Sequence, residues 1–344
     1  MKRTFTYIIG LAAIIMAASC AKEPEVGAND ANKRYLEAWI HIYNQDNNTD
    51  VKASGLGIYV LDETPGTGEK TVTNEGYAVV NYTVTDLNGN ISAFTDENTA
   101  RQMGQYDTTK YYGPKVWCTI NETIEAGIQN AILGMKVGGR KKVLIPSWLM
   151  SYSVYATAEE YFKESTDYSN SIYDITVEDY TDSVDEWQIN KIKTYITEKY
   201  GDLNSFSNDT TGFYYKQLTA PTKDKAFPSD TTIYINYTGK LLNGLVFDTS
   251  IEKVAKDNNL YTPAKKYGPV EIRWGESYTD LTMGSNASSI ISGFAMTLWR
   301  MKAMESGIGI FYSPLGYGYS GSGTSIPGYS PLVFEIEIVE NPEK

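Results

Sequence analysis

Residues 233–250 read IYINYTGKLLNGLVFDTS, and this stretch decides the fold of the segment around it. Over residues 231–237, β-branched and aromatic residues alternate with polar ones, which is typical of a strand with one buried face. Asn243-Gly244 follows, and this dipeptide predicts a tight turn between two strands. The sequence therefore predicts an antiparallel hairpin whose second strand ends in Phe247 and Asp248, an aromatic ring beside a carboxylate.

An earlier part of the chain repeats this segment at a fixed distance. Three matches are each separated by 155 residues, namely Gly57-Ile-Tyr59 with Gly212-Phe-Tyr214, Asn81-Tyr-Thr83 with Asn236-Tyr-Thr238, and Tyr112-Gly-Pro114 with Tyr267-Gly-Pro269. Two later matches, Gly127 with Gly293 and Met135 with Met301, are 166 residues apart, because the second copy has a longer loop before Ile290. A fixed period of this kind predicts a tandem duplication.

Helical patterns introduce both copies. Residues 33–44 and 184–200 carry apolar side chains at helical spacing. Within each copy the pattern is rich in strands with one short helix, which the second copy places at residues 290–301. Strands combined with a single helix in each unit predict the α+β class.

Charge and composition exclude several classes of function. The chain has 42 Asp and Glu against 30 Lys and Arg, a formal net charge of −12. Nucleic acid is therefore not expected as a partner, because phosphate binding needs clustered basic residues. His41 is the only histidine, so imidazole-based triads and metal sites are nearly excluded, and neither a cofactor nor a metal is expected.

The N-terminus has the pattern of an export signal. Lys2 and Arg3 precede an apolar run over residues 7–18 that is too short to span a bilayer. Small residues then lead to Cys20, an arrangement that resembles the lipobox of bacterial lipoproteins and implies lipidation of that thiol. A simple cleaved signal peptide is the alternative. With Cys20 lipidated, Cys118 is the only other cysteine, so we expect no internal disulfide.

A series of short motifs runs in order through the second copy: Tyr237-Thr-Gly239, Asn243-Gly244, Phe247-Asp-Thr-Ser250, Ile290-Ile-Ser-Gly-Phe294, Met301, Ser313-Pro-Leu-Gly-Tyr-Gly318, Ile326-Pro327 and Leu332-Val-Phe334. This series resembles the FKBP-type peptidyl-prolyl isomerases, whose signature runs Y-T-G, D-G, F-D-S-S, V-I-x-G-W, M-x-x-G, P-x-x-A-Y-G, I-P and L-x-F-x-V. The resemblance implies an antiparallel sheet wrapped around one short helix, and an isomerase that needs no nucleophile.

The resemblance also implies a set of site residues. The catalytic set is Tyr237, Phe247, Asp248 and Tyr317, and the substrate-binding walls are Val270, Ile290, Ile291, Phe294, Ile326 and Phe334. Asp248 would orient the aromatic wall. Tyr317, in a flexible Gly-rich flap, would donate a hydrogen bond to the substrate carbonyl, and the backbone N–H of Ile291 would donate another. Ile326 would form an apolar lip over the substrate proline.

Both copies depart from the family pattern. In the second copy, Phe294 stands where the family has the Trp that floors the pocket, Val270 stands where a Phe closes one wall, and long inserts occupy residues 249–266 and 276–289. In the first copy, residues 94–96 (Phe-Thr-Asp) stand where Phe-Asp is expected, and the A-Y-G motif is absent ahead of a longer flap at residues 153–171. We therefore expect a retained fold with a lost or altered site in the first copy.

The expected organisation is a lipoprotein signal peptide at 1–20, a tether and N-terminal helix at 21–50, a degenerate FKBP-like domain at 51–182, a helical linker at 183–202 and an FKBP-type isomerase domain at 203–344. The predicted function is peptidyl-prolyl isomerisation of Xaa-Pro segments in unfolded or exported proteins, by a monomer anchored in the cell envelope, with the outer membrane as the expected membrane and its face left open. The alternatives are a non-catalytic chaperone, and a surface lipoprotein that binds glycans or proteins on FKBP-like scaffolds through the chain's 28 tyrosines.

Overall fold

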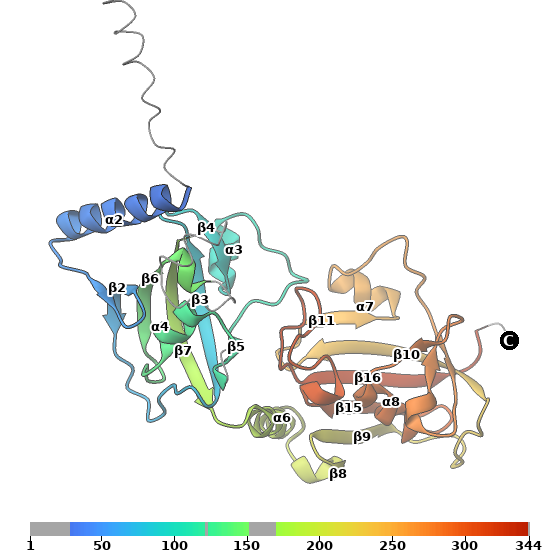
Figure 1. Ribbon diagram of the computed structural model, residues 1–344. Coiled ribbons are helices and arrows are strands. Elements are labelled where there is room, and N and C mark those ends of the chain that lie inside the picture. Colours follow the sequence, from blue (N-terminus) through green and yellow to red (C-terminus); the bar gives the residue numbers. More distant parts are fainter. Residues whose placement is uncertain (1–27, 121–122, 151–169, 343–344) are drawn as a thin grey trace, which may run out of the picture.

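The computed structural model describes residues 28–120, 123–150 and 170–342 (Figure 1). These residues form two antiparallel sheets, one in each copy of the repeat, and helix α6 (Val184–Tyr200) lies between them. The predicted signal peptide and Cys20 lie outside the described residues, as does most of the flap expected in the first copy.

Helix α2 (Ala28–Asn47) packs on the first copy and is longer at both ends than the predicted helix at 33–44. Leu36 and Ile40 lie one turn apart and are buried in a cluster that includes Leu144 and Ile172. The apolar stripe read from the sequence therefore faces the sheet. No helix in the described part of the chain is both long enough and apolar enough to cross a bilayer.

The first sheet has the strand order β1-β2-β6-β7-β3-β4, with β5 paired to β3. Helix α3 (Glu97–Gln102) follows β4, and helix α4 (Ala126–Ile132) packs on β6 and β2. The strand bounds are β1 Ala53–Ser54, β2 Ile58–Thr64, β3 Tyr77–Thr85, β4 Ile91–Phe94, β5 Lys115–Cys118, β6 Arg140–Ile145 and β7 Ser171–Thr181.

The second sheet has the order β14-β13-β12-β10-β16-β15-β9-β8, with β11 paired to β10. Helix α7 (Glu252–Asp257) follows β11. The strand bounds are β8 Ser207–Thr210, β9 Phe213–Thr219, β10 Thr232–Leu241, β11 Val246–Thr249, β12 Val270–Arg273, β13 Thr282–Met283, β14 Ser288–Ser289, β15 Ser306–Phe311 and β16 Leu332–Val339.

One short helix covers each sheet, and glycines let it lie close. In α8 (Ser292–Trp299), residues 293–298 are all buried. A Cβ on Gly293 would lie 2.3 Å from the ring of Phe311, and a Cβ on Gly309 would lie 1.9 Å from Oγ1 of Thr297. Larger residues at these two positions would push the helix away from β15. The predicted α+β class, two units each with an antiparallel sheet covered by one short helix, is confirmed, and each unit has one further short helix, α3 or α7, that was not predicted.

The strand registers repeat at the same distance as the sequence. Thr83 pairs with Phe94 on β3 and β4, and Thr238 pairs with Thr249 on β10 and β11, each 155 residues further on. By this register the first-copy counterpart of Asp248 is Ala93. The assignment of Phe94-Thr-Asp96 to the Phe-Asp motif was therefore wrong.

The carboxylate of Asp96 has a local structural role instead. It accepts a hydrogen bond from the backbone N–H of Thr99 at 2.7 Å and caps α3. Helix N-termini favour such a side chain because their first N–H groups lack partners within the helix. The similarity in letters thus reflected a helix cap rather than a copy of the site.

Helix α6 contacts both copies. Ser183 caps its first turn by accepting from the N–H of Glu186, and Gly201, with φ of 79°, ends it. Ile192 and Ile196 are fully buried in a cluster with residues of β9, β15 and β16. At its other end, the indole N–H of Trp187 donates to Asp179 on β7 at 3.0 Å.

Candidate active site

Four aromatic side chains meet on the inner face of the second sheet. The ring of Phe294 lies edge to face with Tyr237 at 5.5 Å and with Phe334 at 4.9 Å between centroids, and Phe247 meets Phe334 in the same way at 5.6 Å. Edge-to-face pairs of this kind contribute about 0.5–1.5 kcal/mol each beyond burial of their area. We call these four residues the aromatic box.

The hairpin at residues 232–249 positions two walls of the box. Gly239 on β10 pairs with both Phe334 on β16 and Asp248 on β11. A Cβ on Gly239 would lie 2.7 Å from the rings of both Phe247 and Phe334. The rings meet only because this position lacks a side chain, which explains the glycine in the Tyr-Thr-Gly motif.

Asp248 connects the box to two polar groups. Its Oδ2 accepts a hydrogen bond from the hydroxyl of Tyr237 at 2.7 Å, and its Oδ1 accepts one from Nζ of Lys265 at 2.5 Å. Burial, followed by the charge of Asp248, raises the pKa of Tyr237 well above its usual value of 10. Tyr237 therefore stays protonated and keeps donating to the carboxylate, which fixes its ring as a wall.

Lys265 was not foreseen from the sequence. It lies in the insert at 249–266, and nothing in its local sequence distinguishes it from Lys266. The side chains of Asp248 and Lys265 are 42% and 39% exposed, so the ion pair contributes at most about 1 kcal/mol to stability. Its effect on the site is the orientation of the carboxylate.

Tyr317 follows a short 3-10 helix (Ser313–Leu315) in a tightly bonded turn. The N–H of Gly318 donates to the carbonyl of Ser313 at 2.8 Å, and the N–H of Gly321 donates to that of Tyr317 at 3.2 Å. Burial, followed by the charge of Asp248, raises the pKa of the Tyr317 hydroxyl. Within the described residues this hydroxyl makes no hydrogen bond, so it remains available as a donor.

The remaining predicted residues pack around the box. Val270, Ile290 and Ile291 are half-buried against its cluster, and Ile326 is part of the cluster itself. Ile291 precedes α8, and its carbonyl accepts the N–H of Ala295 at 3.1 Å, whereas its own N–H makes no hydrogen bond to a described residue. The structure thus brings all ten predicted residues together, although their roles stay predictions.

Ile326 differs from its expected setting. As a lip over the substrate it would be open to solvent, yet it is only 4% exposed. The flap, residues 316–331, folds back on itself through hydrogen bonds between Ser322 and Ile326 and from the N–H of Tyr329 to the carbonyl of Gly318. This fold turns Ile326 inward, so it forms part of the wall.

The first copy lacks most of this chemistry. The register places Ser92 and Ala93 where Phe247 and Asp248 stand in the second copy. Tyr82, the counterpart of Tyr237, stacks instead on the ring of Trp117 at 5.0 Å between centroids. A carboxylate next to an aromatic box is therefore absent from the described part of this copy.

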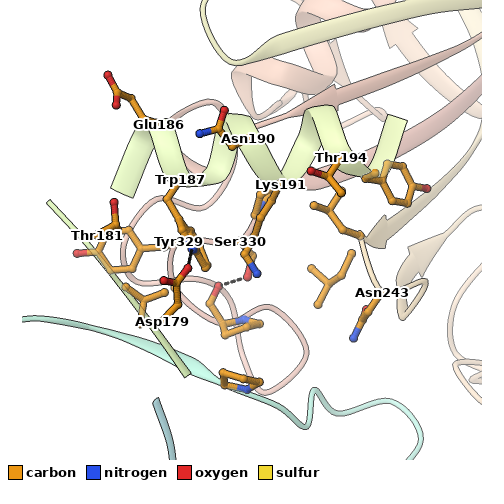
Figure 2. Close-up of a pocket in the computed structure, with 18 of the residues that line it drawn as sticks. Asp179, Thr181, Glu186, Trp187, Asn190, Lys191, Thr194, Asn243, Tyr329 and Ser330 are labelled. Carbon is orange, nitrogen blue, oxygen red and sulfur yellow. Dashed lines mark hydrogen bonds between the residues drawn. The ribbon is translucent and has the colours of Figure 1, made fainter. Parts of the chain in front are cut away.

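A separate cleft of about 690 Å³ lies on the outer side of the flap, between the two copies (Figure 2). Helix α6 contributes Trp187 and Lys191, β7 contributes Asp179, and the flap contributes Tyr329 and Ser330. Sequence patterns did not predict this cleft. The described residues hold no group of three or more His, Cys, Asp and Glu side chains suited to a metal ion.

Comparison with known proteins identifies the second copy. The family model described as FKBP-type peptidyl-prolyl cis-trans isomerase matches residues 223–339. A probable FKBP-type isomerase of Haemophilus influenzae is 30% identical over 133 residues, which cover 38% of this chain and 44% of that protein. The FKBP-type 22 kDa isomerase of Escherichia coli is 33% identical over 116 residues, which cover 33% and 44%.

The chain thus spans less than half the length of these two curated relatives. A solved structure of the three FKBP domains of wheat FKBP73 aligns with 82% of this chain and 94% of that one, at 13% identity and a TM-score of 0.28. Residues 223–339 are an FKBP-type peptidyl-prolyl isomerase domain, and the resemblance read from the motifs is confirmed.

Proposed function

We propose that the FKBP-type domain, taken as residues 203–344, catalyses cis-trans isomerisation of Xaa-Pro bonds in unfolded or exported proteins. One observation carries this proposal: the hydroxyl of Tyr237 is fixed by Asp248 at the edge of an aromatic box within the matched segment. A cluster of aromatic rings of this kind suits the ring of a proline. No imidazole or metal is needed for the chemistry.

The mechanism follows from the nature of the bond. Rotation about an amide has a barrier of about 18–20 kcal/mol, because resonance holds the peptide planar. A site that binds the twisted amide more tightly than either planar form lowers this barrier. In the twisted state the carbonyl loses conjugation, and donors from Tyr317 and the N–H of Ile291 would hold it while the box holds the proline ring.

We infer that the first copy, residues 51–182, serves as a binding or structural unit. Ala93 occupies the position in the first copy that Asp248 occupies in the second, and Trp117 stacks on Tyr82. Both observations support a non-catalytic role. Helix α6, within the linker at 183–202, would keep the two units in a fixed relation through its contacts with both.

We place the protein in the cell envelope as a monomer held by a lipid on Cys20. Residues 1–20, with their basic start, short apolar run and cysteine, support this location. The outer membrane is the membrane that we expect. A simple cleaved signal peptide would leave the chain in the same compartment without an anchor.

A non-catalytic chaperone is the second candidate function. The cleft of about 690 Å³ between the copies favours it, because Trp187 and Tyr329 give it aromatic surface next to the polar groups of Asp179 and Lys191. Under this alternative, client proteins bind in the cleft, and the aromatic box neither binds nor isomerises them. We prefer the isomerase because the ten residues predicted for its site lie close together in the structure.

A prolyl isomerisation assay on the full chain decides between these functions, with Asp248→Ala and Tyr317→Phe beside the wild type. We expect acceleration by the wild type and a loss in both variants. If the wild type shows no acceleration above the uncatalysed rate and does not bind FK506, the isomerase proposal fails. Suppression of aggregation by such an inactive chain would support the chaperone.

A further inference from the structure

Residues 104–114 of the first copy form a loop that extends from α3 towards the second copy (Figure 1). The backbone N–H of Tyr111 donates to the carbonyl of Thr324 in the flap at 3.0 Å. Nδ2 of Asn259, in the insert that carries Lys265, donates to Oγ1 of Thr108 at 3.0 Å. The loop therefore bridges the two segments that supply Tyr317 and the partner of Asp248. We call it the bridging loop.

The side chain of Tyr111 packs on the hydrophobic core of the other copy. Its ring packs against the hydrophobic cluster that contains Tyr237, Phe294, Ile326 and Phe334. Its hydroxyl donates to the carbonyl of Pro114 at 3.0 Å, which holds the ring against its own loop. Burial raises the pKa of this hydroxyl. A residue of the first copy thus packs against the core cluster to which the box of the second copy belongs.

The repeat shows that the loop does not need Tyr111 for its own fold. In the first copy the hydroxyl of Tyr112 accepts from the N–H of Asp107 and donates to the carbonyl of Gln105. In the second copy Tyr267 makes the equivalent bonds with residues 262 and 260. The counterpart of Tyr111 is Lys266, which is exposed. The tyrosine at 111 therefore serves the contact between the copies.

A second contact holds the far end of the flap. The ring of Tyr329 lies 5.5 Å from that of Tyr77 on β3, in an edge-to-face arrangement. Figure 2 shows Tyr329 between β7 and α6, next to Thr181 and Trp187. The first copy thus contacts the flap at two points, Thr324 and Tyr329, which lie on either side of Ile326 in the sequence.

We propose that Tyr111 is a positioning residue for the site of the second copy, and that Xaa-Pro segments are recognised by a site built from both copies. The proposal rests on the isomerase function proposed above. A flap that is docked before substrate arrives needs less ordering on binding, which increases affinity. Tyr111 then acts through the flap, by holding Tyr317 and Ile326 in place.

The test compares Tyr111→Ala, Tyr111→Phe and the wild type in the full chain. Tyr35→Ala, at an exposed tyrosine of α2, is the matched control. The probe is a blocked tetrapeptide with a Leu-Pro bond. We expect Tyr111→Ala to raise both Kd and KM about fivefold to tenfold while kcat changes less than about twofold, because docking affects binding. Hydrogen exchange at the amides of Gly318 and Tyr329 should become about tenfold faster.

Tyr111→Phe and Tyr35→Ala should behave as the wild type in all these measurements, since both keep the ring at 111. Thr108→Ala, which removes only the bond to Asn259, should shift Kd and exchange in the same direction by a smaller factor. It serves as the second variant if Tyr111→Ala fails to fold. Unchanged Kd and exchange in the folded variants, or a rise in kcat/KM that would reveal Tyr111 as a plug, overturns the proposal.

The two proposals fail in distinguishable ways. A wild-type chain that binds the peptide without accelerating isomerisation defeats the isomerase function, and Kd and exchange then still decide the role of Tyr111. A wild-type chain that isomerises, with Tyr111→Ala identical to it, defeats only the role of Tyr111. A wild-type chain that binds no peptide overturns both.

Discussion

The hydroxyl of Tyr237 donates to Oδ2 of Asp248 at 2.7 Å, across paired strands β10 and β11. Tyr237 is 8% exposed, so this bond satisfies a hydroxyl that has little access to water. The carboxylate therefore has two effects: it stabilises the second copy and it fixes one wall of the box. These effects can be separated by mutation.

Asp248→Ala should lower kcat/KM about tenfold to a hundredfold, because a hydrogen bond to a charged group contributes about 1.5–3 kcal/mol. It should also destabilise the fold by about 1–3 kcal/mol, since the hydroxyl of Tyr237 is left buried and unpaired. The double variant Tyr237→Phe/Asp248→Ala should be at least as stable as Asp248→Ala in urea unfolding. A double variant that is less stable would contradict this reading of the bond.

Lys265→Met should leave stability within about 1 kcal/mol of the wild type, because its ion pair with Asp248 is partly exposed. Activity should nevertheless fall about twofold to fivefold, as the carboxylate loses one of its three hydrogen-bond donors, Tyr237, Lys265 and the N–H of Thr249. Lys265→Arg should restore most of it. Lys266→Met is the matched control, one residue along, and an equal loss of activity there would show that the insert acts only through its total charge.

Gly239→Ala should destabilise the second copy by about 1–3 kcal/mol, because the new Cβ would lie 2.7 Å from the rings of Phe247 and Phe334. The rings must move apart to admit it, so affinity for a prolyl peptide should fall as well. Urea unfolding and a peptide titration measure the two effects. A variant with wild-type stability and affinity would show that the box is loosely packed.

The position of the lipid is tested by Cys20→Ser. We expect this change to abolish lipid attachment and release the protein from the membrane fraction, as judged by intact mass and fractionation. Cys118→Ser, at the second cysteine of the chain, is the matched control and should keep the lipid. A wild-type chain that is cleaved and carries no lipid would support the simple signal peptide instead.

Local patterns predicted the elements of the second copy well. A tight turn forms at Asn243-Gly244, in which Gly244 alone has a positive φ, of 90°, and the predicted helix at 290–301 is observed as α8 over 292–299. These features depend on residues close together in the chain, where turn chemistry and apolar spacing dominate. The aromatic box followed because its residues lie at fixed places on those elements.

Features that depend on distant segments could not be predicted in this way. Lys265 reaches Asp248 only because the insert folds back, and Tyr111 reaches Thr324 only because α6 holds the copies together. The wrong assignment of Asp96 to the Phe-Asp motif has a related cause. Strand register decides which residue occupies the position of Asp248, and similarity of short sequences does not. Burial of Ile326 likewise follows from bonds within the whole flap.

Alkaline pH should destabilise the protein, because several tyrosines have raised pKa values in the folded state. Burial raises the pKa of Tyr329 to about 12, and it raises that of Tyr237 further. An unfolded chain ionises its tyrosines near pH 10, so above this pH the unfolded state binds fewer protons than the native state. Stability is therefore complete below about pH 10 and falls as pH rises towards 12 and beyond.

Each such tyrosine should lower the free energy of unfolding by up to about 1.4 kcal/mol per pH unit in this range. Urea unfolding at pH 9, 10 and 11 measures the slope. Tyr237→Phe and Tyr329→Phe should each reduce the slope by about one proton, because neither phenylalanine can ionise in the unfolded chain. Tyr278→Phe, at an exposed tyrosine, is the matched control. If Tyr329→Phe keeps the full dependence of unfolding free energy on pH, the ring of Tyr329 is exposed to water. The contact between Tyr77 of the first copy and Tyr329 of the flap is then absent in solution.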